Sequence, residues 1–218
     1  MKPLTVCGPG GPFAPVRECA KSFARSRGES VEVLKSEPSF WRGYWEEGVD
    51  VFYGGAPYML EDFHRQNPDI LDLSTLQDLW PRDIGILVRS GNPLRIDSLV
   101  DLGRSEARLL DVQIEKMEAL QKEAFFGRHT PAHSVLTGEQ GRQAWVSKPD
   151  LDAWITYRTW HAALNDGTGF VPLAGQADAT RPAVVALTRN ARREAALAFV
   201  AFLKSEEAHA VFREHGWT

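Results

Sequence analysis

The turn Gly8-Pro9-Gly10-Gly11-Pro12 has the residue types that can bind an anion through the backbone. It follows a short apolar run and precedes a segment with apolar residues at helical spacing. A glycine-rich turn at the start of a helix presents backbone N–H groups at the positive end of the helix dipole. Gly10 and Gly11 are therefore candidate anion donors. The turn lacks the spacing of a dinucleotide fingerprint and the Gly-Lys-Ser/Thr of a P-loop, so a purely steric role for its glycines stays open.

Two further turns have a similar character. Ser36 to Ser39 opens an expected helix after the second strand, and Gly54-Gly55-Ala56 follows the third strand. In an open α/β sheet, such turns lie at the carboxyl ends of the strands, where ligands bind. Three small or polar turns at one edge therefore favour a binding site, with Ser39, Gly54 and Gly55 as candidates. Simple helix capping by the serines is the alternative.

A second group of candidates lies in the other half of the chain. Thr137 is placed to cap a helix, and Tyr157 and Arg158 come just after a strand. A Tyr hydroxyl and a guanidinium are natural donors to an oxyanion. The alternative is that Arg158 is a solvated surface charge and Tyr157 a packing residue.

Signals of catalysis or metal binding are weak. The chain has no Gly-x-Ser-x-Gly motif. His129 and His133 are four residues apart, but Pro131 between them argues against the helix that would make them a metal pair. Carboxylates are scattered, and the pair Asp111 and Glu115 is the one that an enzyme interpretation would use. We therefore expect a protein that is not an enzyme and has no metal or cofactor.

Composition narrows the function further. The chain has 218 residues, with 25 Lys or Arg, 29 Asp or Glu and a formal net charge of -4. A mildly acidic chain lacks the dense cationic surface of a general nucleic-acid binder, so no nucleic-acid partner is expected. Hydrophobic residues make up 43%, which is typical of a soluble globular protein. The length suits one large domain or two lobes of roughly 100 residues.

The compartment is not decided by these residues. Cys7 should end a strand and Cys19 should lie in the next helix, too far apart for a disulfide, so two free and mostly buried thiols are expected. The longest apolar run, Ala183 to Leu187, is far shorter than a membrane span. No basic start followed by an apolar signal region is present. A cytoplasmic protein, and a periplasmic one whose leader was removed and replaced by Met1, are both consistent with this start.

Apolar runs alternate with segments of helical periodicity, which predicts an α/β fold with a parallel sheet and helices on both faces. Gly28 and Gly216 are placed to end helices, and Ser205 to begin one. The expected strands cover residues 4–7, 31–34, 49–53, 84–88, 109–112, 134–136, 153–156 and 184–187. The expected helices cover residues 13–27, 39–47, 58–66, 97–102, 114–126, 138–146, 194–204 and 205–214.

Several segments resemble the accessory colonization factor AcfC-like proteins. The opening from Val6 to Pro12 looks like the start of that family, and Val49 to Ala56 matches its third strand and turn. Lys148 to His161, which reads KPDLDAWITYRTWH, resembles its second signature. The C-terminal segment, residues 199–218 (FVAFLKSEEAHAVFREHGWT), is similar to the last two helices of this family and of molybdate-binding proteins. The resemblance spans nearly the whole chain and is most specific in the glycine turn and the DAWI segment.

The resemblance implies a type II periplasmic solute-binding protein fold. In this fold two Rossmann-like α/β lobes are joined by a hinge of two strands, which here would be Ile84 to Arg89 and Ala183 to Thr188. Lobe I would then comprise residues 1–84 plus 190–218, and lobe II residues 85–189. A lobe built from two separate segments explains why no linear domain boundary is visible in the sequence.

The resemblance also implies a function and partners. The protein would capture a small anion in a cleft between the lobes: a molybdate- or sulfate-type oxyanion, a small carboxylate or a phosphorylated acid. An ABC permease would be its membrane partner, and both a monomer and a homodimer are open. The alternative is a colonisation, adhesion or chemosensory binding protein that keeps the fold without transport. The ligand groups carried over by position are Gly10, Gly11, Ser39, Gly55, Thr137 and Tyr157.

One segment departs from the family pattern. The family usually has a glycine-rich loop after the first strand of the second lobe, whereas residues 110–115 here read LDVQIE, with two carboxylates and no glycine. The third-strand turn also lacks the hydroxyl residues often found there. A carboxylate in this loop would repel an anion, so we expect either a different ligand or weaker binding.

Overall fold

The computed structural model describes residues 2–126, 130–164, 167–173, 175 and 179–218. The chain forms two compact units, with unit 1 made of residues 1–81 and 181–218 and unit 2 of residues 82–180. The chain passes from one unit to the other within two strands, β4 (Leu71–Arg89) and β9 (Thr180–Thr188). The expected division after residues 84 and 189 differs from these bounds most at the second crossing. There, residues 184–187 pair with a strand of unit 1.

Unit 1 contains a mixed sheet rather than the expected parallel one. Strand β1 (Leu4–Gly8) pairs in parallel with β2 (Val31–Lys35) and with β3 (Val51–Gly54). Strand β9 then pairs antiparallel with β3. The strand order is β2-β1-β3-β9, with β4 next. The parallel expectation was wrong for β9 because its chain enters from unit 2 rather than from a crossover helix of unit 1.

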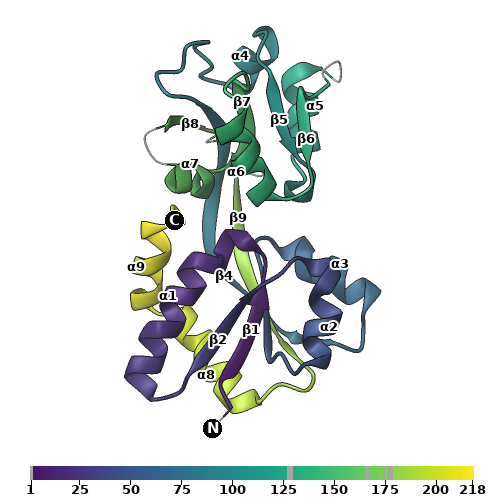
Figure 1. The fold of residues 1–218 in the computed structure, drawn as a ribbon, viewed down its shortest axis with the longest axis vertical. Coiled ribbons are helices and arrows are strands. Elements are labelled where there is room, and N and C mark those ends of the chain that lie inside the picture. Colours follow the sequence, from purple (N-terminus) through teal and green to yellow (C-terminus); the bar gives the residue numbers. More distant parts are fainter. Residues whose placement is uncertain (1, 127–129, 165–166, 174, 176–178) are drawn as a thin grey trace. The chain divides into compact units, whose positions relative to one another are not determined.

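Helices cover both faces of the unit 1 sheet (Figure 1). One face carries the long helix α1 (Gly10–Arg27) with α8 (Arg193–Leu203) and α9 (Glu206–Glu214), and the other carries α2 (Trp41–Glu46) and α3 (Pro57–Gln66). Strand β3 serves both faces, because successive side chains point to opposite sides. Val51 and Tyr53 pack into the cluster beneath α1 and α8. Phe52 stacks on Trp41 on the opposite face, with ring centroids 5.0 Å apart.

Unit 2 has its own mixed sheet. Strand β5 (Leu109–Val112) pairs in parallel with β6 (His133–Val135) and β7 (Ala153–Tyr157). The second half of β4 pairs antiparallel with β7 and with β8 (Thr168–Pro172). The helical segments of this unit are α4 (Leu99–Arg104), the 3₁₀ turn η2 (Gln113–Glu115), α5 (Glu118–Phe125), α6 (Gly138–Ser147) and α7 (Arg158–Leu164).

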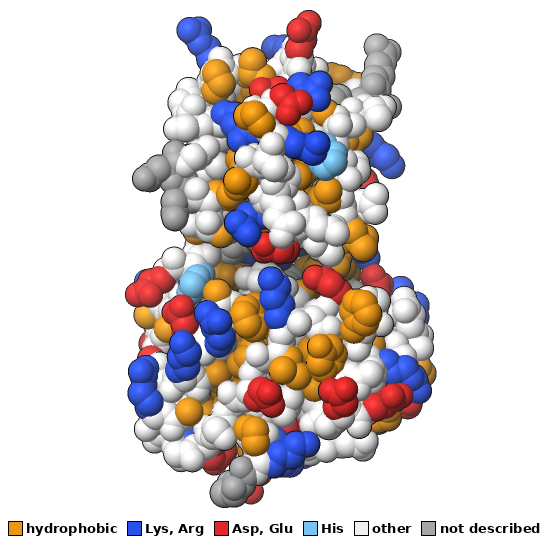
Figure 2. Space-filling view, viewed as in Figure 1, with side chains coloured by type: hydrophobic (Ala, Val, Ile, Leu, Met, Phe, Trp, Pro, Cys, Tyr) orange, Lys and Arg blue, Asp and Glu red, His pale blue; other side chains and the backbone are white. Residues whose placement is uncertain are grey.

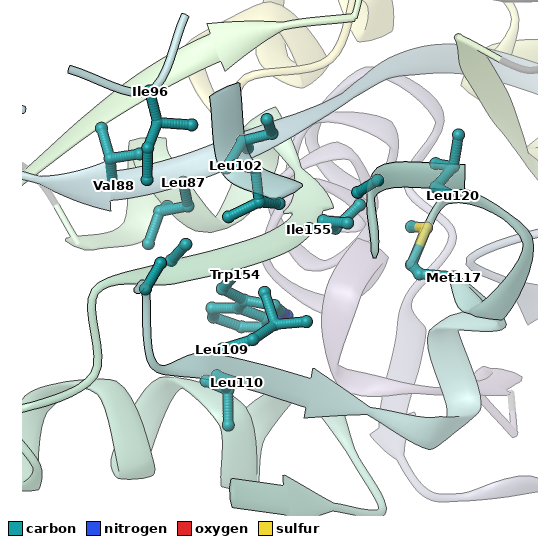
Figure 3. Close-up of a cluster of buried hydrophobic side chains, with 14 of the residues drawn as sticks. Leu87, Val88, Ile96, Leu102, Leu109, Leu110, Met117, Leu120, Trp154 and Ile155 are labelled. Atoms are coloured by element: carbon teal, nitrogen blue, oxygen red, sulfur yellow. The ribbon is translucent and has the colours of Figure 1, made fainter. Parts of the chain in front are cut away.

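The core of unit 2 is built around the sheet formed by β4, β5 and β7. Figure 3 shows Trp154 of β7 beside Leu109 of β5, with Leu87, Leu102 and Ile155 nearby. All five side chains are almost completely buried. Because each large buried apolar side chain contributes roughly 1.5–3 kcal/mol, this cluster is a major source of the stability of unit 2.

Several sequence expectations can be compared with these elements. Gly28 adopts a left-handed conformation (φ 71°) and ends α1, and the Ser205 hydroxyl accepts a hydrogen bond from the backbone N–H of Ala208 at the start of α9, as expected. Cys7 and Cys19 are free and buried, also as expected. The expected helix 114–126 is confirmed for its second part, where α5 covers Glu118–Phe125; its start is instead the 3₁₀ turn η2, and Lys116 between the two has a positive φ of 52°. Residues 71–83, α7 and β8 were not anticipated.

The distribution of charged side chains and the character of the helices are consistent with the composition. Figure 2 shows basic and acidic side chains interspersed on the visible face of each unit. Within the described residues, none of the helices combines the length and apolar character needed to cross a membrane.

A buried carboxylate ties the end of unit 1 to its first strand. Asp50, which is 3% exposed, accepts hydrogen bonds from the backbone N–H of Thr5 (3.0 Å) and of Arg192 (2.8 Å). The Arg192 guanidinium also pairs with Asp50 and donates to the carbonyls of Lys2 and Pro3. Burial alone would raise the pKa of Asp50, but the hydrogen bonds from Arg192 and Thr5 outweigh it and lower that pKa.

We expect Asp50→Asn to destabilise unit 1 by about 1–3 kcal/mol at pH 7, because the substitution leaves buried donors facing an amide. A carboxyl whose folded pKa is lowered stabilises the protein above its unfolded pKa, and this stabilisation is lost as pH falls through the folded pKa. The deficit of the variant in urea unfolding should therefore shrink as pH falls below the usual pKa of an Asp side chain. Asp69→Asn, at an exposed carboxylate 3.9 Å from Arg42, is the matched control. A deficit that stays constant with pH would contradict this account.

Candidate functional site

The carboxyl ends of β1, β2 and β3 lie at one edge of the unit 1 sheet, since all three strands run parallel. Gly8 at the end of β1 is opposite Lys35 at the end of β2, and Cys7 is opposite Phe52 of β3. The turns that follow these strands contain the candidates Gly10 and Gly11, Ser39, and Gly54 and Gly55. The fold therefore brings these three turns to the same edge of unit 1 (Figure 1).

The start of α1 brings two sources of positive charge to this edge. Pro9 occupies the N-cap in an extended conformation and has no polar side chain to cap the helix. Gly10 and Gly11 provide the first N–H groups, because Pro12 has none. The Lys35 side chain lies over this point: a Cβ atom on Gly10 would be 3.0 Å from Lys35 Cε and 3.5 Å from Nζ. A helix N-terminus and an ammonium group therefore act in the same place.

A recess of about 430 Å³ opens beside Lys35, lined by Ser36, Glu37, Phe40 and Tyr44. Phe40 is 65% exposed, which is unusual for so large an apolar side chain. Burial raises the pKa of Glu37, and the charge of Lys35 opposes this rise. The recess therefore combines a cation, a partly buried carboxyl group and an aromatic wall at the end of β2.

The other unit 1 candidates are placed less favourably. Ser39 is exposed and lies in the 3₁₀ turn η1 (Pro38–Phe40), not at the first residue of α2 as expected. Gly54 is the last residue of β3 and is buried. The Gly55 N–H donates to the Met59 sulfur at 3.3 Å, so it is engaged within its own turn.

Unit 2 has a comparable edge, formed by the carboxyl ends of β5, β6 and β7. Thr137 follows β6 and caps α6: its hydroxyl accepts from the Gln140 N–H, and the Gln140 side chain accepts from the Thr137 N–H. This capping confirms the expected position of Thr137 and leaves its hydroxyl proton to donate elsewhere. Tyr157 is the last residue of β7 and is 1% exposed.

Two cations lie near Tyr157 and differ in their surroundings. Arg158 pairs with Asp83, with Nε 2.8 Å from Oδ2, and its guanidinium lies over the Phe170 ring. Arg82 is 3% exposed, and its guanidinium carbon lies 3.4 Å from the centroid of the Tyr157 ring. Arg158 therefore has a partner at the surface rather than being the solvated charge considered above, while Arg82 is a buried cation.

Asp111 and Glu115, the pair that an enzyme interpretation would use, have different partners. Asp111 accepts from the Gln121 amide (2.7 Å) and the Ser134 hydroxyl (3.3 Å). Glu115 is 4% exposed, and its two oxygens accept from Thr156 and from Trp160. The two carboxylates thus belong to different hydrogen-bond networks, which gives no support to an acid/base pair. Burial raises the pKa of Glu115 to about 7, although Thr156, the charge of Arg82 and the Trp160 N–H all oppose the rise.

Among the described residues, no group of three or more His, Cys, Asp or Glu side chains is arranged to hold a metal ion. His133 lies in β6, and His129 lies outside the described residues.

Comparison with known families identifies the chain. Residues 4–218 match the family of bacterial extracellular solute-binding proteins. The chain belongs to this family. Comparison with curated protein sequences gives no match. The AcfC-like resemblance is a finer assignment than the family match and stays an expectation.

Solved structures show the same fold for this solute-binding protein. Peb3 from Campylobacter jejuni has a TM-score of 0.79 at 23% identity, covering 98% of each chain. The Azotobacter vinelandii periplasmic molybdate-binding protein has a TM-score of 0.74 at 14% identity, covering 99% of this chain and 98% of that one. The sulfate-binding protein SubI from Mycobacterium tuberculosis H37Rv has a TM-score of 0.74 at 15% identity, covering 100% of this chain and 86% of that one. The α/β fold of the type II periplasmic binding proteins is thus confirmed.

Sequence reasoning missed the charged groups nearest these edges. Lys35 is the last residue of a strand with ordinary alternation, and only the register of β1 with β2 brings it to Gly10. Arg82 lies in a polar stretch of β4 that gives no sign of burial. Glu115 was noticed as a carboxylate in the loop after β5, but its burial and its partners on β7 and α7 depend on tertiary contacts.

The burial of Glu115 predicts a pH dependence of the unfolding free energy that can be measured without a ligand. A carboxyl whose folded pKa is raised stabilises the protein fully below its unfolded pKa, and this contribution is lost as pH rises through the folded pKa. For Glu115 that window runs from about 4.5 to about 7. Relative to Glu115→Gln, the wild-type protein should lose about 3 kcal/mol of unfolding free energy across the window and then level off. Urea unfolding at closely spaced pH values measures this difference.

Asp111→Asn provides the control in the same loop. Because it keeps Glu115, it should lose stability relative to Glu115→Gln across the same window as the wild type does. A Glu115→Gln difference that is flat across this window would mean that Glu115 stays ionised in the folded protein.

Proposed function

We propose that this solute-binding protein captures a small anion and presents it to an ABC permease in the periplasm. The observation that carries the proposal is the meeting of Lys35 with the uncapped start of α1 at the carboxyl edge of three parallel strands. Backbone N–H groups at a helix start and an ammonium group both favour negative charge.

Each unit offers proposed ligand contacts of its own. Unit 1 offers Gly10 and Gly11 as the strongest donors, with Ser39, Gly54 and Gly55 at the same edge. Unit 2 offers Thr137 and Tyr157, together with Arg158, whose pairing with Asp83 reduces its attraction for a ligand. Closure of two lobes over the ligand, as the family resemblance implies, is part of the proposal.

Related structures support the class of ligand. Similar proteins are described as molybdate-binding and sulfate-binding, and one structure of PEB3 holds L-phospholactate. All three ligands are oxyanions or carry oxyanion groups. The recess beside Lys35, with the exposed Phe40 ring, has room for an organic body as well as for the anionic group.

A thermal-shift screen tests the proposal. The panel comprises molybdate, tungstate, sulfate, phosphate, citrate, phosphoglycerate and L-phospholactate, at equal ionic strength. Ligand at about 100 times its Kd adds roughly 2.7 kcal/mol of stability, which raises Tm by roughly 5–10 °C for a chain of this size. At least one anion should give such a shift. If none of these anions raises Tm, the proposal of anion capture is rejected and a binding partner of another kind is favoured.

Lys35→Gln makes the test specific to the unit 1 edge. Removal of the ammonium group should weaken binding of the best anion roughly three- to tenfold in calorimetry, since the side chain is exposed and its charge is partly screened. Lys21→Gln removes the same charge further along α1 and is the matched control. Equal effects of the two substitutions would show that net charge, and not position, determines affinity.

Tyr157→Phe tests the unit 2 edge. The ring and its contact with Arg82 are retained, while the hydroxyl donor is lost. We expect anion affinity to fall roughly five- to thirtyfold, as for the loss of one buried hydrogen bond, with the folded structure intact by circular dichroism. An unchanged Kd would exclude the Tyr157 hydroxyl from the site.

A further inference from the structure

Glu115 is a buried acid that the proposed function leaves without a role. The side chain follows β5 in the turn η2 and is 4% exposed. The Thr156 hydroxyl donates to Oε2 at 2.7 Å, and the Trp160 indole N–H donates to Oε1 at 2.7 Å. Burial of an ionised carboxylate at this depth costs free energy, unless a nearby positive charge balances it or a proton neutralises it.

The groups around Glu115 can be named element by element. Strand β4 contributes Arg82, whose positive charge favours the ionised carboxylate. Strand β7 contributes Thr156 and Trp154, and the Trp154 N–H also favours the ionised form although it makes no hydrogen bond of normal geometry. Helix α7 contributes Trp160. On the same turn, Lys116 follows Glu115 and is exposed.

Other charges on these elements are engaged elsewhere. Asp83 of β4 pairs with Arg158 of α7, and the His161 imidazole of α7 lies 2.7 Å from the Thr168 hydroxyl. Arg82 is therefore the charge that chiefly opposes protonation of Glu115.

The two hydrogen bonds determine where a proton can bind. An indole N–H can only donate, so Oε1 must stay an acceptor for Trp160. A hydroxyl can both donate and accept, so Thr156 can rotate and accept a proton carried by Oε2. Glu115 can thus gain a proton on Oε2 with both contacts preserved, which makes the change of charge reversible within the folded protein.

Arg82 and Trp160 link the candidate anion contacts of unit 2 to this acid. The Arg82 guanidinium, whose charge acts on Glu115, also stacks on the Tyr157 ring. On the other side, Trp160 packs against the first residue of α6, where a Cβ atom on Gly138 would be 2.3 Å from Trp160 Cζ2. Gly138 follows Thr137. An anion held by Thr137 and Tyr157 would therefore lie near Arg82 and Trp160, the two side chains that also act on Glu115.

We propose that anion binding at the unit 2 edge is coupled to uptake of one proton by Glu115, so that Glu115 sets the pH range in which the ligand is held. The inference rests on the proposed anion-binding function. A bound anion partly neutralises the positive charge of Arg82, which favours the ionised form of Glu115, and it also repels the Glu115 carboxylate. Both effects favour the protonated acid. Reciprocally, protonation of Glu115 removes a negative charge near Arg82, and this strengthens anion binding.

Calorimetry with sulfate or molybdate, whichever binds, tests this coupling. Both probes stay fully ionised between about pH 6 and 8, so any proton exchanged belongs to the protein. Titration at pH 7 in two buffers with different ionisation enthalpies measures the protons taken up. If the anion raises the pKa of Glu115 by about one unit, uptake is roughly 0.4 proton per anion and Kd is about fivefold weaker at pH 8 than at pH 6.

Variants separate this coupling from other titrations. Glu115→Gln should take up no proton and bind with nearly the same Kd at pH 6 and pH 8. Asp111→Asn, in the same loop, should behave like the wild type. Thr156→Val, which removes one donor and keeps the shape, should shift the pH dependence to higher pH, and it serves if Glu115→Gln does not fold.

The outcomes are distinguishable. Proton uptake by the wild type and Asp111→Asn but not by Glu115→Gln supports the inference. Anion binding with equal proton uptake by Glu115→Gln and the wild type overturns the inference and leaves the proposed function standing. Absence of anion binding to the wild type at every pH removes the proposed function, and the inference with it.

Discussion

Parallel pairing of strands is the constraint on which the candidate sites depend. In each unit a central strand, β1 or β5, pairs in parallel with a neighbour on either side, so three carboxyl ends share one edge. Every candidate contact follows one of these strand ends or is the last residue of a strand. A slip of one residue in β2 against β1 would turn Lys35 away from Gly10, because side chains alternate between faces. The electrostatics of the edge is thus fixed by backbone register before any ligand arrives.

Each edge combines a cation with a carboxyl group, but the two pairs differ in their exposure to solvent. In unit 1, Lys35 is exposed beside the partly buried Glu37, so water and salt screen the charge that an anion meets. In unit 2, Arg82 and Glu115 are both buried, and small changes of charge there act over a longer distance. The exposed pair suits attraction of an anion from solution, and the buried pair suits control of how strongly it is held.

Much of the fold could be predicted from the sequence because most elements have clear boundaries. Glycine at position 28 and the Ser205 and Thr137 caps fix helix ends locally. The first part of β4 was missed for a physical reason: buried positions there recur at residues 71, 75 and 79, which is not the alternation of a half-buried strand. The mixed sheets were missed because direction depends on where β9 and β4 enter each unit, which no local pattern records.

The candidate sites were less predictable because their charges depend on tertiary contacts. The sequence indicated the glycine turn, Thr137 and Tyr157, whose roles follow from strand ends and helix starts. It also indicated that Glu115, in a loop where relatives have glycines, would repel an anion. The structure changes that argument, because Thr156 and Trp160 hold this carboxylate inside the protein instead of presenting it to a ligand. A buried acid can be neutralised by a proton, whereas an exposed one at neutral pH cannot. The carboxylate that seemed to oppose anion binding is therefore compatible with it, on the condition that the bound state is also the protonated state.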